Sequence, residues 1–176
     1  AEVCAANGIH GRIFESLRPT PELSFAVREY DCQAGINVTA SHNPKEYNGY
    51  KVYWSDGAQL PPQHAAAIAR ELEQIDIFTG IRRMEFDDAK AQGLIEIMGA
   101  ETDERFMSHV MAMVNDRESM AKVADTFHMV YTPFHGCGWK LVPEALRGLG
   151  VKHLHCVPEQ MVLDGSFPTV VSPNPE

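Results

Sequence analysis

The sequence predicts an α/β fold in which mixed sheets are flanked by helices. Two observations favour this class. Short apolar segments of strand length alternate with longer segments whose apolar residues recur every three or four positions. A strand–helix–strand pattern occurs twice, once over 12–39 and again over 127–157. We therefore expect part of one domain followed by the start of a second, similar domain.

Residues 12–39 are expected to form a strand, a helix and a second strand. The first strand ends at 12–14, and the two prolines of 18–21 make the following loop rigid because each fixes its own φ. A helix is predicted from about Glu22, and the second strand over 34–39. Strand–helix–strand units with short links normally form right-handed crossovers, so we expect these two strands to pair in parallel.

A chain reversal and further elements follow this unit. Asn48-Gly49 is a strong turn signal, and the residues after it, 50–54, are predicted to form a strand. Residues 65–75 place their apolar side chains on one stripe, which predicts an amphipathic helix. The stretch 79–92 is polar and mixed, and a short strand is expected over 93–98.

Another helix is predicted to start at Thr102, whose hydroxyl would cap it, with acidic residues in the first turn. The charged stretch 115–118 is the best candidate for a linker. The buried side of the helix is expected to carry four apolar side chains, namely Phe106, Val110, Met113 and Val114.

The second strand–helix–strand pattern lies beyond this linker. A strand is predicted over 127–132, followed by a helix over 141–149. Gly150 is expected to end that helix in the left-handed conformation, and residues 151–157 to form the returning strand. This βαβ unit indicates a second domain.

Composition and charge narrow the classes of function. The chain has 24 acidic and 15 basic residues and a net charge of −9, which disfavours nucleic acid and anionic membranes as partners. No apolar run reaches the length of a membrane helix. The four cysteines are widely spaced without a Cys-x-x-Cys pair, and no secretory leader is recognisable, so we expect a cytoplasmic protein.

The candidate site lies in the loop that follows the predicted strand over 34–39. Ser41 and His42 are adjacent there, and a serine hydroxyl needs a nearby base to become a good nucleophile. Lys51 is within reach if the chain reverses at Asn48-Gly49. Loops after the carboxyl ends of such strands are where α/β folds place their chemistry. The pattern indicates a serine that carries a transferable group.

Several motifs resemble those of the α-D-phosphohexomutases, the phosphoglucomutase and phosphomannomutase superfamily. The stretch from Thr39 to Lys51 is similar to the family's catalytic-serine loop, and the following segment looks like that of the glucose-type members. The resemblance covers nearly the whole chain. Four further segments match family motifs in the expected order: 18–28, 56–60, 131–138, and 164–169 with 173–176.

The resemblance implies a phosphoserine enzyme. Ser41 would give its phosphoryl group to a sugar monophosphate and take the other phosphate back from the resulting bisphosphate. Lys51 matches a lysine that exchanges a proton with the reacting hydroxyl, and His42 matches the adjacent histidine of the site. Asn43 and Asn48 would shape the loop or contact the substrate. Glucose 1-phosphate and glucose 6-phosphate are the implied substrates.

The resemblance also implies Mg²⁺ as the cofactor. The phosphate on Ser41 would supply one oxygen ligand, and the family's aspartate-rich metal loop would follow Glu176. The chain thus resembles the C-terminal part of the catalytic-serine domain over 1–104 and the N-terminal part of the next domain over 105–176. Its partners would be the remaining domains of the same polypeptide, and we expect the isolated chain to be inactive.

The sequence is also compatible with other functions. Within the family, the activity could be that of a phosphopentomutase or a phosphomannomutase, and from a different class the chain could be a folded packing module without activity. A serine hydrolase is disfavoured because no Gly-x-Ser-x-Gly motif surrounds Ser41. His153 and His155 share one face of the predicted strand and Cys156 points to the other, so these three residues make a poor zinc site. His135 is expected to be a structural loop residue.

Overall fold

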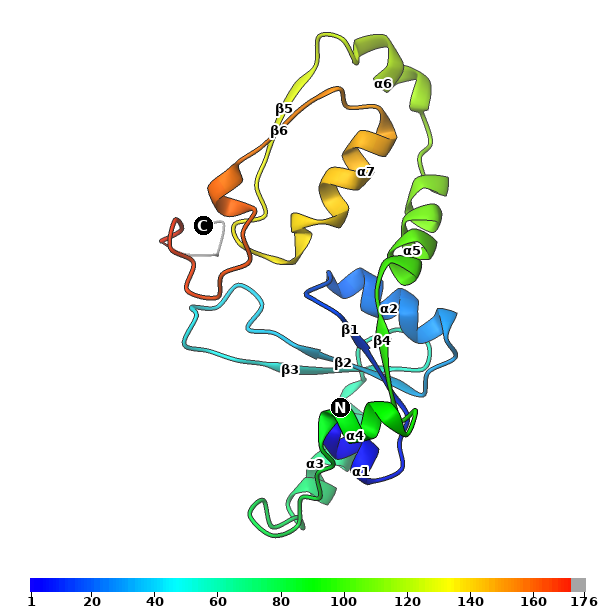
Figure 1. The fold of residues 1–176 in the computed structure, drawn as a ribbon, viewed down its shortest axis with the longest axis vertical. Helices are drawn as coiled ribbons and strands as arrows, with labels where there is room; N and C mark the ends of the chain where they lie inside the picture. Colours follow the sequence, from blue (N-terminus) through cyan, green and yellow to red (C-terminus); the bar gives the residue numbers. More distant parts are fainter. Residues whose placement is uncertain (172–176) are drawn as a thin grey trace. The chain divides into compact units, whose positions relative to one another are not determined.

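The computed structural model describes residues 1–171 of the 176-residue chain, and Figure 1 shows the elements in chain order. Backbone contacts divide these residues into two compact units. The first unit comprises 1–16 and 59–101, and the second comprises 17–58 together with the described residues from 102 onward. Both parallel and antiparallel strand pairs occur with helices beside them, which confirms the predicted α/β class. The domain boundary between 104 and 105 stays a prediction.

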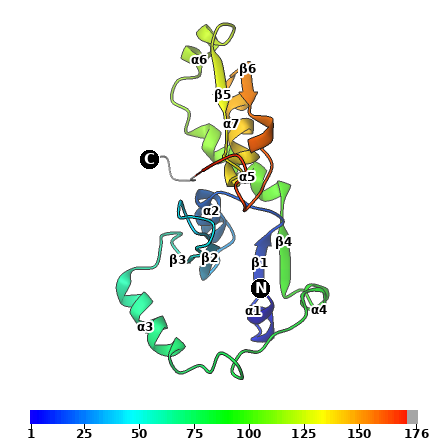
Figure 2. The same ribbon diagram turned by 90° about the vertical axis from the view of Figure 1, so that its left-hand side faces the viewer.

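The first unit contains one parallel pair of strands (Figure 2). β1 (Gly11–Phe14) pairs with β4 (Ile95–Met98), so that Gly11 lies opposite Ile95 and Phe14 opposite Met98. β4 confirms the strand predicted over 93–98. A short two-stranded pair is marginal in water by itself, so it depends on the helices that pack beside it.

Two short helices of the first unit pack against each other. α1 (Glu2–Ala6) contacts α4 (Phe86–Ala91), and α4 also contacts β4. Ala5 and Ala89 are fully buried in the small core between them, and Phe86 packs against that core. α4 lies in the polar stretch 79–92, for which no helix or strand was predicted. Its apolar signal is short because Phe86 and Ala89 alone, three residues apart, mark the buried face.

α3 (Pro62–Leu72) confirms the helix expected over 65–75, but its apolar stripe is not buried by the part of the chain that the structure describes. Ile68 is 39% exposed and Leu72 is 61% exposed. Helical periodicity indicates that a face is suited to burial, but it does not specify the surface that covers that face.

The second unit carries an antiparallel hairpin where a parallel strand pair was expected. β2 (Ala34–Val38) pairs with β3 (Tyr50–Trp54), and Asn37 lies opposite Lys51. The predicted parallel pairing of the first two strands is therefore wrong within residues 1–171, where β1 pairs with β4. The reversal at Asn48-Gly49 returns the chain beside β2, so β3 satisfies its backbone hydrogen-bonding groups.

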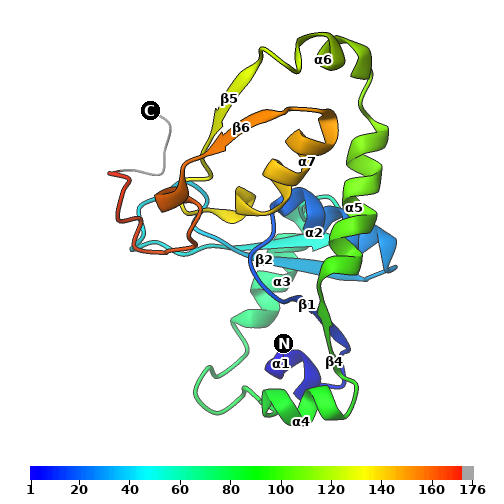
Figure 3. The same ribbon diagram turned by 45° about the horizontal axis from the view of Figure 1, so that its top comes forward.

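α2 (Thr20–Glu29) packs on β2 of this hairpin (Figure 3). Its buried apolar face consists of Phe25, Ala26 and Val27. Gly35 of β2 allows the close approach, since a Cβ at this position would lie 2.7 Å from a methyl group of Val27. The helix predicted from Glu22 therefore forms, with a strand packed directly beneath it.

The second predicted βαβ unit is confirmed. β5 (His128–Tyr131) and β6 (His153–Cys156) pair in parallel, and α7 (Leu141–Leu149) connects them and contacts β6. Gly150 ends α7 with a φ of +106°, the left-handed conformation that glycine adopts without strain. Figure 1 shows the two strands side by side with α7 next to them.

α5 (Ala100–Ala112) differs from the predicted helix at its start and on its buried side. Thr102 lies inside the helix, where it is buried and its hydroxyl is 2.8 Å from Tyr30 Oη, so it does not cap the helix. Met113, expected to be buried, is 78% exposed. The buried residues of α5 are polar, namely Thr102 and Asp103, because their side chains meet polar partners from other segments.

The predicted linker over 115–118 is confirmed at 115–116, which lie between α5 and α6, whereas 117–118 form the start of α6 (Arg117–Val123). Asp116 caps this helix by accepting a hydrogen bond from the Ser119 N–H at 2.9 Å. No helix among the described residues is long and apolar enough to cross a membrane. Two single-turn helices complete the described elements, namely η1 (Cys137–Trp139) and η2 (Pro158–Gln160).

A buried ionic cluster joins the residues before α2, the first turn of α5 and the residue before α7. Arg18 donates hydrogen bonds to Asp103 from Nε at 2.6 Å and from Nη2 at 2.9 Å, and the two side chains are 1% and 5% exposed. Lys140 Nζ donates to the same carboxylate at 2.6 Å. Glu22 is fully buried with Oε2 at 3.8 Å from Arg18 Nε, beyond hydrogen-bond distance.

The two carboxyl groups of this cluster titrate in opposite directions. Burial, together with the adjacent Asp103 carboxylate, raises the pKa of Glu22 to about 8. Burial alone would also raise the pKa of Asp103, but hydrogen bonds from Arg18 and Lys140 hold that pKa below its ordinary value. Glu22 is therefore protonated at neutral pH, so Asp103 is the one buried anion of this cluster.

Glu22→Gln is expected to flatten the pH dependence of the second unit's stability. The folded-state pKa of Glu22 lies above its ordinary value of 4.5, so its contribution to stability is complete below pH 4.5 and is lost as the pH rises towards 8. Glutamine stays neutral at every pH, so the variant should be more stable near pH 8 by on the order of 2 kcal/mol. Urea unfolding at pH 5 and pH 8, followed by tryptophan fluorescence, measures this difference.

Glu104→Gln, at an exposed position of α5, controls for the loss of a carboxylate as such. Both tryptophans, Trp54 and Trp139, lie in the second unit and report on its unfolding. Parallel loss of stability between pH 5 and pH 8 in Glu22→Gln and in the unmodified chain would show that Glu22 is ionised in the folded state.

Candidate active site

The loop between β2 and β3 holds Ser41 in an uncommon backbone conformation. The Thr39 N–H donates to the Gly49 carbonyl at 2.9 Å, which closes the base of the loop. Ser41 has a φ of +56°, in the left-handed region that residues other than glycine seldom occupy. Its N–H donates to Thr39 Oγ1 at 3.0 Å and so helps to hold this conformation. Such strain is typical of functional sites.

Ser41 and His42 lie within hydrogen-bond distance of each other. Ser41 Oγ is 3.2 Å from His42 Nδ1, and both residues are exposed. A neutral imidazole with its lone pair on Nδ1 accepts the serine proton in this geometry. The pair can therefore deprotonate and reprotonate a serine hydroxyl that a substrate can reach from solvent.

Asn43 and Asn48 act on the shape of the loop through different groups. The Asn43 N–H donates to the Ala40 carbonyl at 3.0 Å and closes the turn that contains the serine. The Asn48 side-chain Oδ1 accepts a hydrogen bond from the Gly49 N–H at 2.9 Å. These contacts support a role in loop shape, whereas contact with a substrate stays a prediction.

Lys51 lies on β3, on the hairpin that carries the serine loop. Its register partner is Asn37, and directly opposite residues of an antiparallel pair project from the same face. Asn37 Nδ2 donates to Thr20 Oγ1 at 2.8 Å, which ties this face to the start of α2. Lys51 is half-buried. The reach of its ammonium group to Ser41 stays a prediction.

A hollow of about 190 Å³, which no sequence pattern predicts, lies beside the serine loop. The segment that forms its other wall begins with a turn at Asp164, whose Oδ1 accepts from the Ser166 N–H at 2.8 Å and from the Ser166 hydroxyl at 2.6 Å. These hydrogen bonds hold the pKa of Asp164 below its ordinary value. The Asp-Gly-Ser turn is readable in the sequence, but its meeting with the serine loop is not. The hollow is lined by Pro44, Lys45, Glu46, Ser166, Phe167, Val170 and Val171.

His135 is buried, with 3% of its surface exposed. Its Nδ1 lies 2.8 Å from the Val162 carbonyl oxygen, and its Nε2 lies 2.8 Å from Thr169 Oγ1. Because both ring nitrogens are hydrogen-bonded inside the protein, this histidine is not free to exchange protons with a substrate. The contacts agree with the structural role expected of it.

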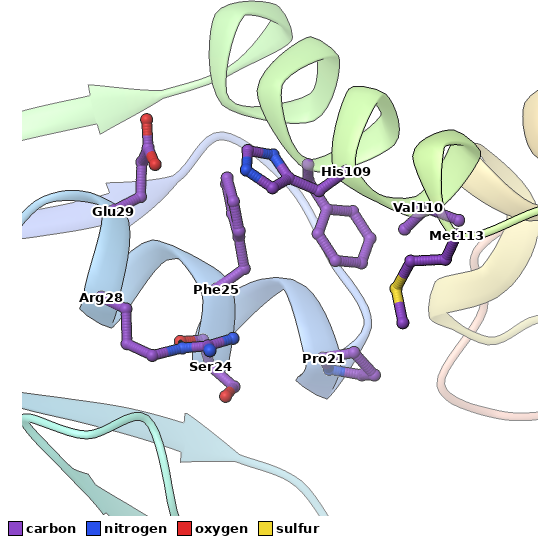
Figure 4. A pocket seen from close by; sticks show the side chains of 9 residues that line it. Pro21, Ser24, Phe25, Arg28, Glu29, His109, Val110 and Met113 are labelled. Carbon is purple, nitrogen blue, oxygen red and sulfur yellow. The ribbon is translucent and has the colours of Figure 1, made fainter.

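A larger hollow of about 650 Å³ lies between α2 and α5 (Figure 4). Within it the Phe25 ring packs against Phe106, with ring centroids 5.5 Å apart, and against His109 at 5.1 Å. None of its lining residues belongs to the serine loop, so it is not part of the candidate site. The remaining lining residues are Pro21, Ser24, Arg28, Glu29, Val110 and Met113.

The described residues do not form a protein metal site by themselves. Among residues 1–171, no group of three or more histidine, cysteine, aspartate or glutamate side chains lies close enough to hold a metal ion. His153 and His155 are exposed on β6, and the His153 ring stacks on His128 at 4.4 Å. The predicted metal ligand within this range is therefore Ser41 alone, and only through a phosphate group.

Comparison with known families gives two matches that together cover most of the chain. Residues 1–77 match the family model described as phosphoglucomutase/phosphomannomutase, alpha/beta/alpha domain I. Residues 104–176 match the model for alpha/beta/alpha domain II of the same family.

Individual relatives agree with these matches. The chain is 36% identical over 176 residues to a phosphoglucomutase from Staphylococcus saprophyticus and 35% identical over 182 residues to one from Staphylococcus aureus. In both cases all of this chain aligns, but it spans only 31% of the relative. A solved structure of a protein assigned as a phosphomannomutase from Thermus thermophilus superimposes with a TM-score of 0.70 at 22% identity, covering 93% of this chain and 33% of that one. At that identity the structural match supports the fold.

Gly49→Ala is expected to open the base of the serine loop. A Cβ at this position would overlap the Thr39 carbonyl oxygen, and backbone atoms cannot move aside as a flexible side chain can. Overpacking of this kind costs about 1–3 kcal/mol, so amide exchange of residues 39–49 should rise by about tenfold or more. Hydrogen exchange followed by mass spectrometry measures the change.

Gly11→Ala, in the other unit, is the matched control, because a Cβ there would make only an ordinary van der Waals contact, 3.9 Å from the Leu94 carbonyl oxygen. It should leave exchange in the serine loop unchanged. If Gly49→Ala behaved like this control, the close approach of Gly49 to Thr39 would not restrain the loop.

Proposed function

We propose that Ser41 carries the phosphoryl group of a sugar-phosphate mutase, because this chain belongs to the phosphoglucomutase/phosphomannomutase family. The resemblance inferred from the sequence motifs holds over 1–77 and 104–176. Members of this family are isomerases that act on sugar phosphates and use a metal ion. The observation that carries the assignment is the 3.2 Å contact between Ser41 Oγ and His42 Nδ1 in an exposed, strained loop.

In the proposed reaction, phosphorylated Ser41 gives its phosphoryl group to a hydroxyl of a sugar monophosphate. The bond from phosphorus to Ser41 Oγ breaks, a bond from phosphorus to the sugar oxygen forms, and the sugar hydroxyl proton ends on Ser41 Oγ. The bisphosphate then returns its other phosphoryl group to Ser41, and the serine proton passes to the sugar oxygen that is released. One phosphate has moved between two sugar hydroxyls, and the enzyme is phosphorylated again.

His42 and Lys51 are the groups proposed to move these protons. His42 Nδ1 is within hydrogen-bond distance of Ser41 Oγ and can accept its proton as the serine attacks. We propose that Lys51 acts first through its positive charge and as an acid, and as a base only later in the cycle. Asn43 and Asn48 hold the turn that presents the serine.

We propose Mg²⁺ as the metal ion. Magnesium prefers carboxylate and phosphate oxygens and, when bound, neutralises charge that spreads over the transferring group. The phosphate on Ser41 would supply one oxygen. Because residues 1–171 contain no cluster of metal-ligating side chains, the aspartate ligands are assigned to residues outside this range.

Glucose 1-phosphate and glucose 6-phosphate are the proposed substrates, since relatives at 35% and 36% identity are phosphoglucomutases. The chain spans 31% of those relatives, so we propose that it acts together with further domains and is inactive alone. We also place it in the cytoplasm, because its four cysteines are free thiols in the structure. The alternatives are phosphomannomutase activity, phosphopentomutase activity and a purely structural role. Turnover measured with different sugar phosphates distinguishes them from phosphoglucomutase activity.

In a full-length protein that contains this chain, mass spectrometry is expected to find phosphate on Ser41. Ser41→Ala should abolish mutase activity because it removes the hydroxyl oxygen that is proposed to carry the phosphoryl group. Turnover of glucose 1-phosphate, mannose 1-phosphate and ribose 1-phosphate is measured side by side to identify the substrate. Activity of Ser41→Ala within about tenfold of the parent, roughly 1.4 kcal/mol of barrier, would exclude Ser41 as the carrier.

Ser55→Ala is the matched control for this substitution, since Ser55 is an exposed serine just after β3. Lys51→Met tests proton transfer separately: phosphate should still be found on Ser41, while kcat falls by about 10²-fold. Unchanged kcat in Lys51→Met would remove Lys51 from the mechanism and leave the role of Ser41 intact.

The 176-residue chain by itself is expected to bind Mg²⁺ only weakly. Without a phosphate, Ser41 offers a neutral hydroxyl, and the described residues provide no carboxylate cluster. Calorimetric titration with MgCl₂ measures the affinity. A saturable site with a micromolar Kd would contradict the assignment of the ligands to other residues, and Asp164→Asn would then show whether the turn at Asp164 forms that site.

A further inference from the structure

A chain of hydrogen bonds joins the loop after β5 to the segment that follows η2. The Phe134 N–H donates to Thr132 Oγ1 at 3.0 Å, and the Thr132 hydroxyl donates to Gln160 Oε1 at 2.5 Å. Gln160 Nε2 donates to Thr169 Oγ1 at 3.1 Å. Thr169 Oγ1 in turn lies 2.8 Å from His135 Nε2. We call the side chains of Thr132, His135, Gln160 and Thr169 the relay.

The Val162 carbonyl determines which groups of the relay donate and which accept. The Val162 carbonyl can only accept, so His135 Nδ1 carries the proton in the 2.8 Å contact between them. In the tautomer with its proton on Nδ1, the lone pair is on Nε2, which accepts from the Thr169 hydroxyl. The same Thr169 oxygen accepts from Gln160. Because His135 is 3% exposed, these bonds fix one tautomer and one ring orientation away from bulk solvent.

Three residues in the two segments joined by the relay have strained backbone conformations. Phe134, His135 and Phe167 have φ values of +48°, +63° and +52°. Such conformations are unfavourable in residues other than glycine, and they persist only where the surrounding structure restrains them. Phe167 lies two residues before Thr169, so the hydrogen bonds of the relay restrain both strained loops.

The segment held by the relay is also one wall of the hollow beside the serine loop. Phe167 and Val170, on either side of Thr169 in sequence, line this hollow of about 190 Å³ together with Lys45 and Glu46. Figures 1 and 3 show the segment after η2 lying beside the loop between β2 and β3. A displacement of Thr169 therefore moves the surface that faces the residues just after the Ser41-His42 pair.

We infer that His135 is a positioning residue for the serine loop, acting through Thr169 and the wall of the hollow. Its effect on turnover rests on the function proposed above, whereas its effect on the order of the loop does not. If His135 had only a local structural role, its hydrogen bonds would stabilise 132–136 and 160–170 and would not affect the order of the serine loop. The two roles are separable because the serine loop belongs to a distant segment of the chain.

Thr169→Val and Thr169→Ser form the matched pair that tests this role. Valine keeps the shape of threonine but lacks the hydroxyl, so Gln160 and His135 lose their shared partner; serine keeps the hydroxyl. Hydrogen exchange of the 176-residue chain is compared over 40–49 and 160–170. Thr169→Val should raise exchange by about tenfold in both regions, and Thr169→Ser by less than about twofold. A rise confined to 160–170, or none at all, overturns the inference.

Gln160→Met is the second variant, for the case that Thr169→Val does not fold. It removes the donor to Thr169 at a half-buried position and should have the same effect on both regions. Nitrogen-15 NMR of the unmodified chain reports the tautomer of His135. A proton on Nε2 in place of Nδ1 would contradict the direction of the relay.

Turnover in a full-length protein separates this inference from the proposed function. Thr169→Val should lower kcat by about tenfold with KM within about twofold, and Thr169→Ser should retain the parent value. Unchanged kcat contradicts the positioning role in catalysis. If Thr169→Val raised hydrogen exchange in both 40–49 and 160–170 but no phosphate were found on Ser41, the positioning role would stand and the mutase would be rejected. If phosphate were found on Ser41 but exchange did not rise in 40–49, the mutase would stand and the positioning role would be rejected.

Discussion

Two short hydrogen bonds from the Arg18 guanidinium to the Asp103 carboxylate hold together the segments on which the second unit depends. Lys140, just before α7, binds the same carboxylate, and Glu22 lies buried beside it. Removing one member of a buried ion pair leaves an uncompensated charge, which is far more costly than the net value of the pair. A protonated Glu22 avoids a second buried anion. We therefore regard the cluster mainly as a constraint on how α2, α5 and α7 meet.

α2 connects this cluster to the hairpin that carries the candidate site. Thr20, at its first turn, accepts a hydrogen bond from Asn37, which lies opposite Lys51. The Ser24 hydroxyl donates to the Gly57 carbonyl at 2.7 Å, just beyond β3. The two strands are thus held from the helix at two points, while the serine loop between them is exposed. This combination of a restrained base and an accessible, strained tip suits a loop that presents a nucleophile to a substrate.

The sequence was most informative where the signals are local. Gly150 marks the end of α7 because a left-handed residue must follow that helix, and Asn48-Gly49 marks the reversal before β3 for a similar reason. The adjacency of Ser41 and His42 is also local, so their contact could be anticipated. The partner of β2 could not, since a strand pattern describes faces and not neighbours. Met113 was misassigned because helical periodicity does not show which face other elements cover.

By itself the sequence determined the α/β class, the positions of most elements and the family to which the chain belongs, because each depends on residues a few positions apart or on motif order. Only the tertiary structure decided that β2 pairs with β3, that Glu22 is buried and keeps a proton, and that Phe167 meets Lys45 across one hollow. These features depend on desolvation and on contacts between segments distant in the chain. Neither quantity is encoded in a local pattern, since both depend on which groups folding brings together.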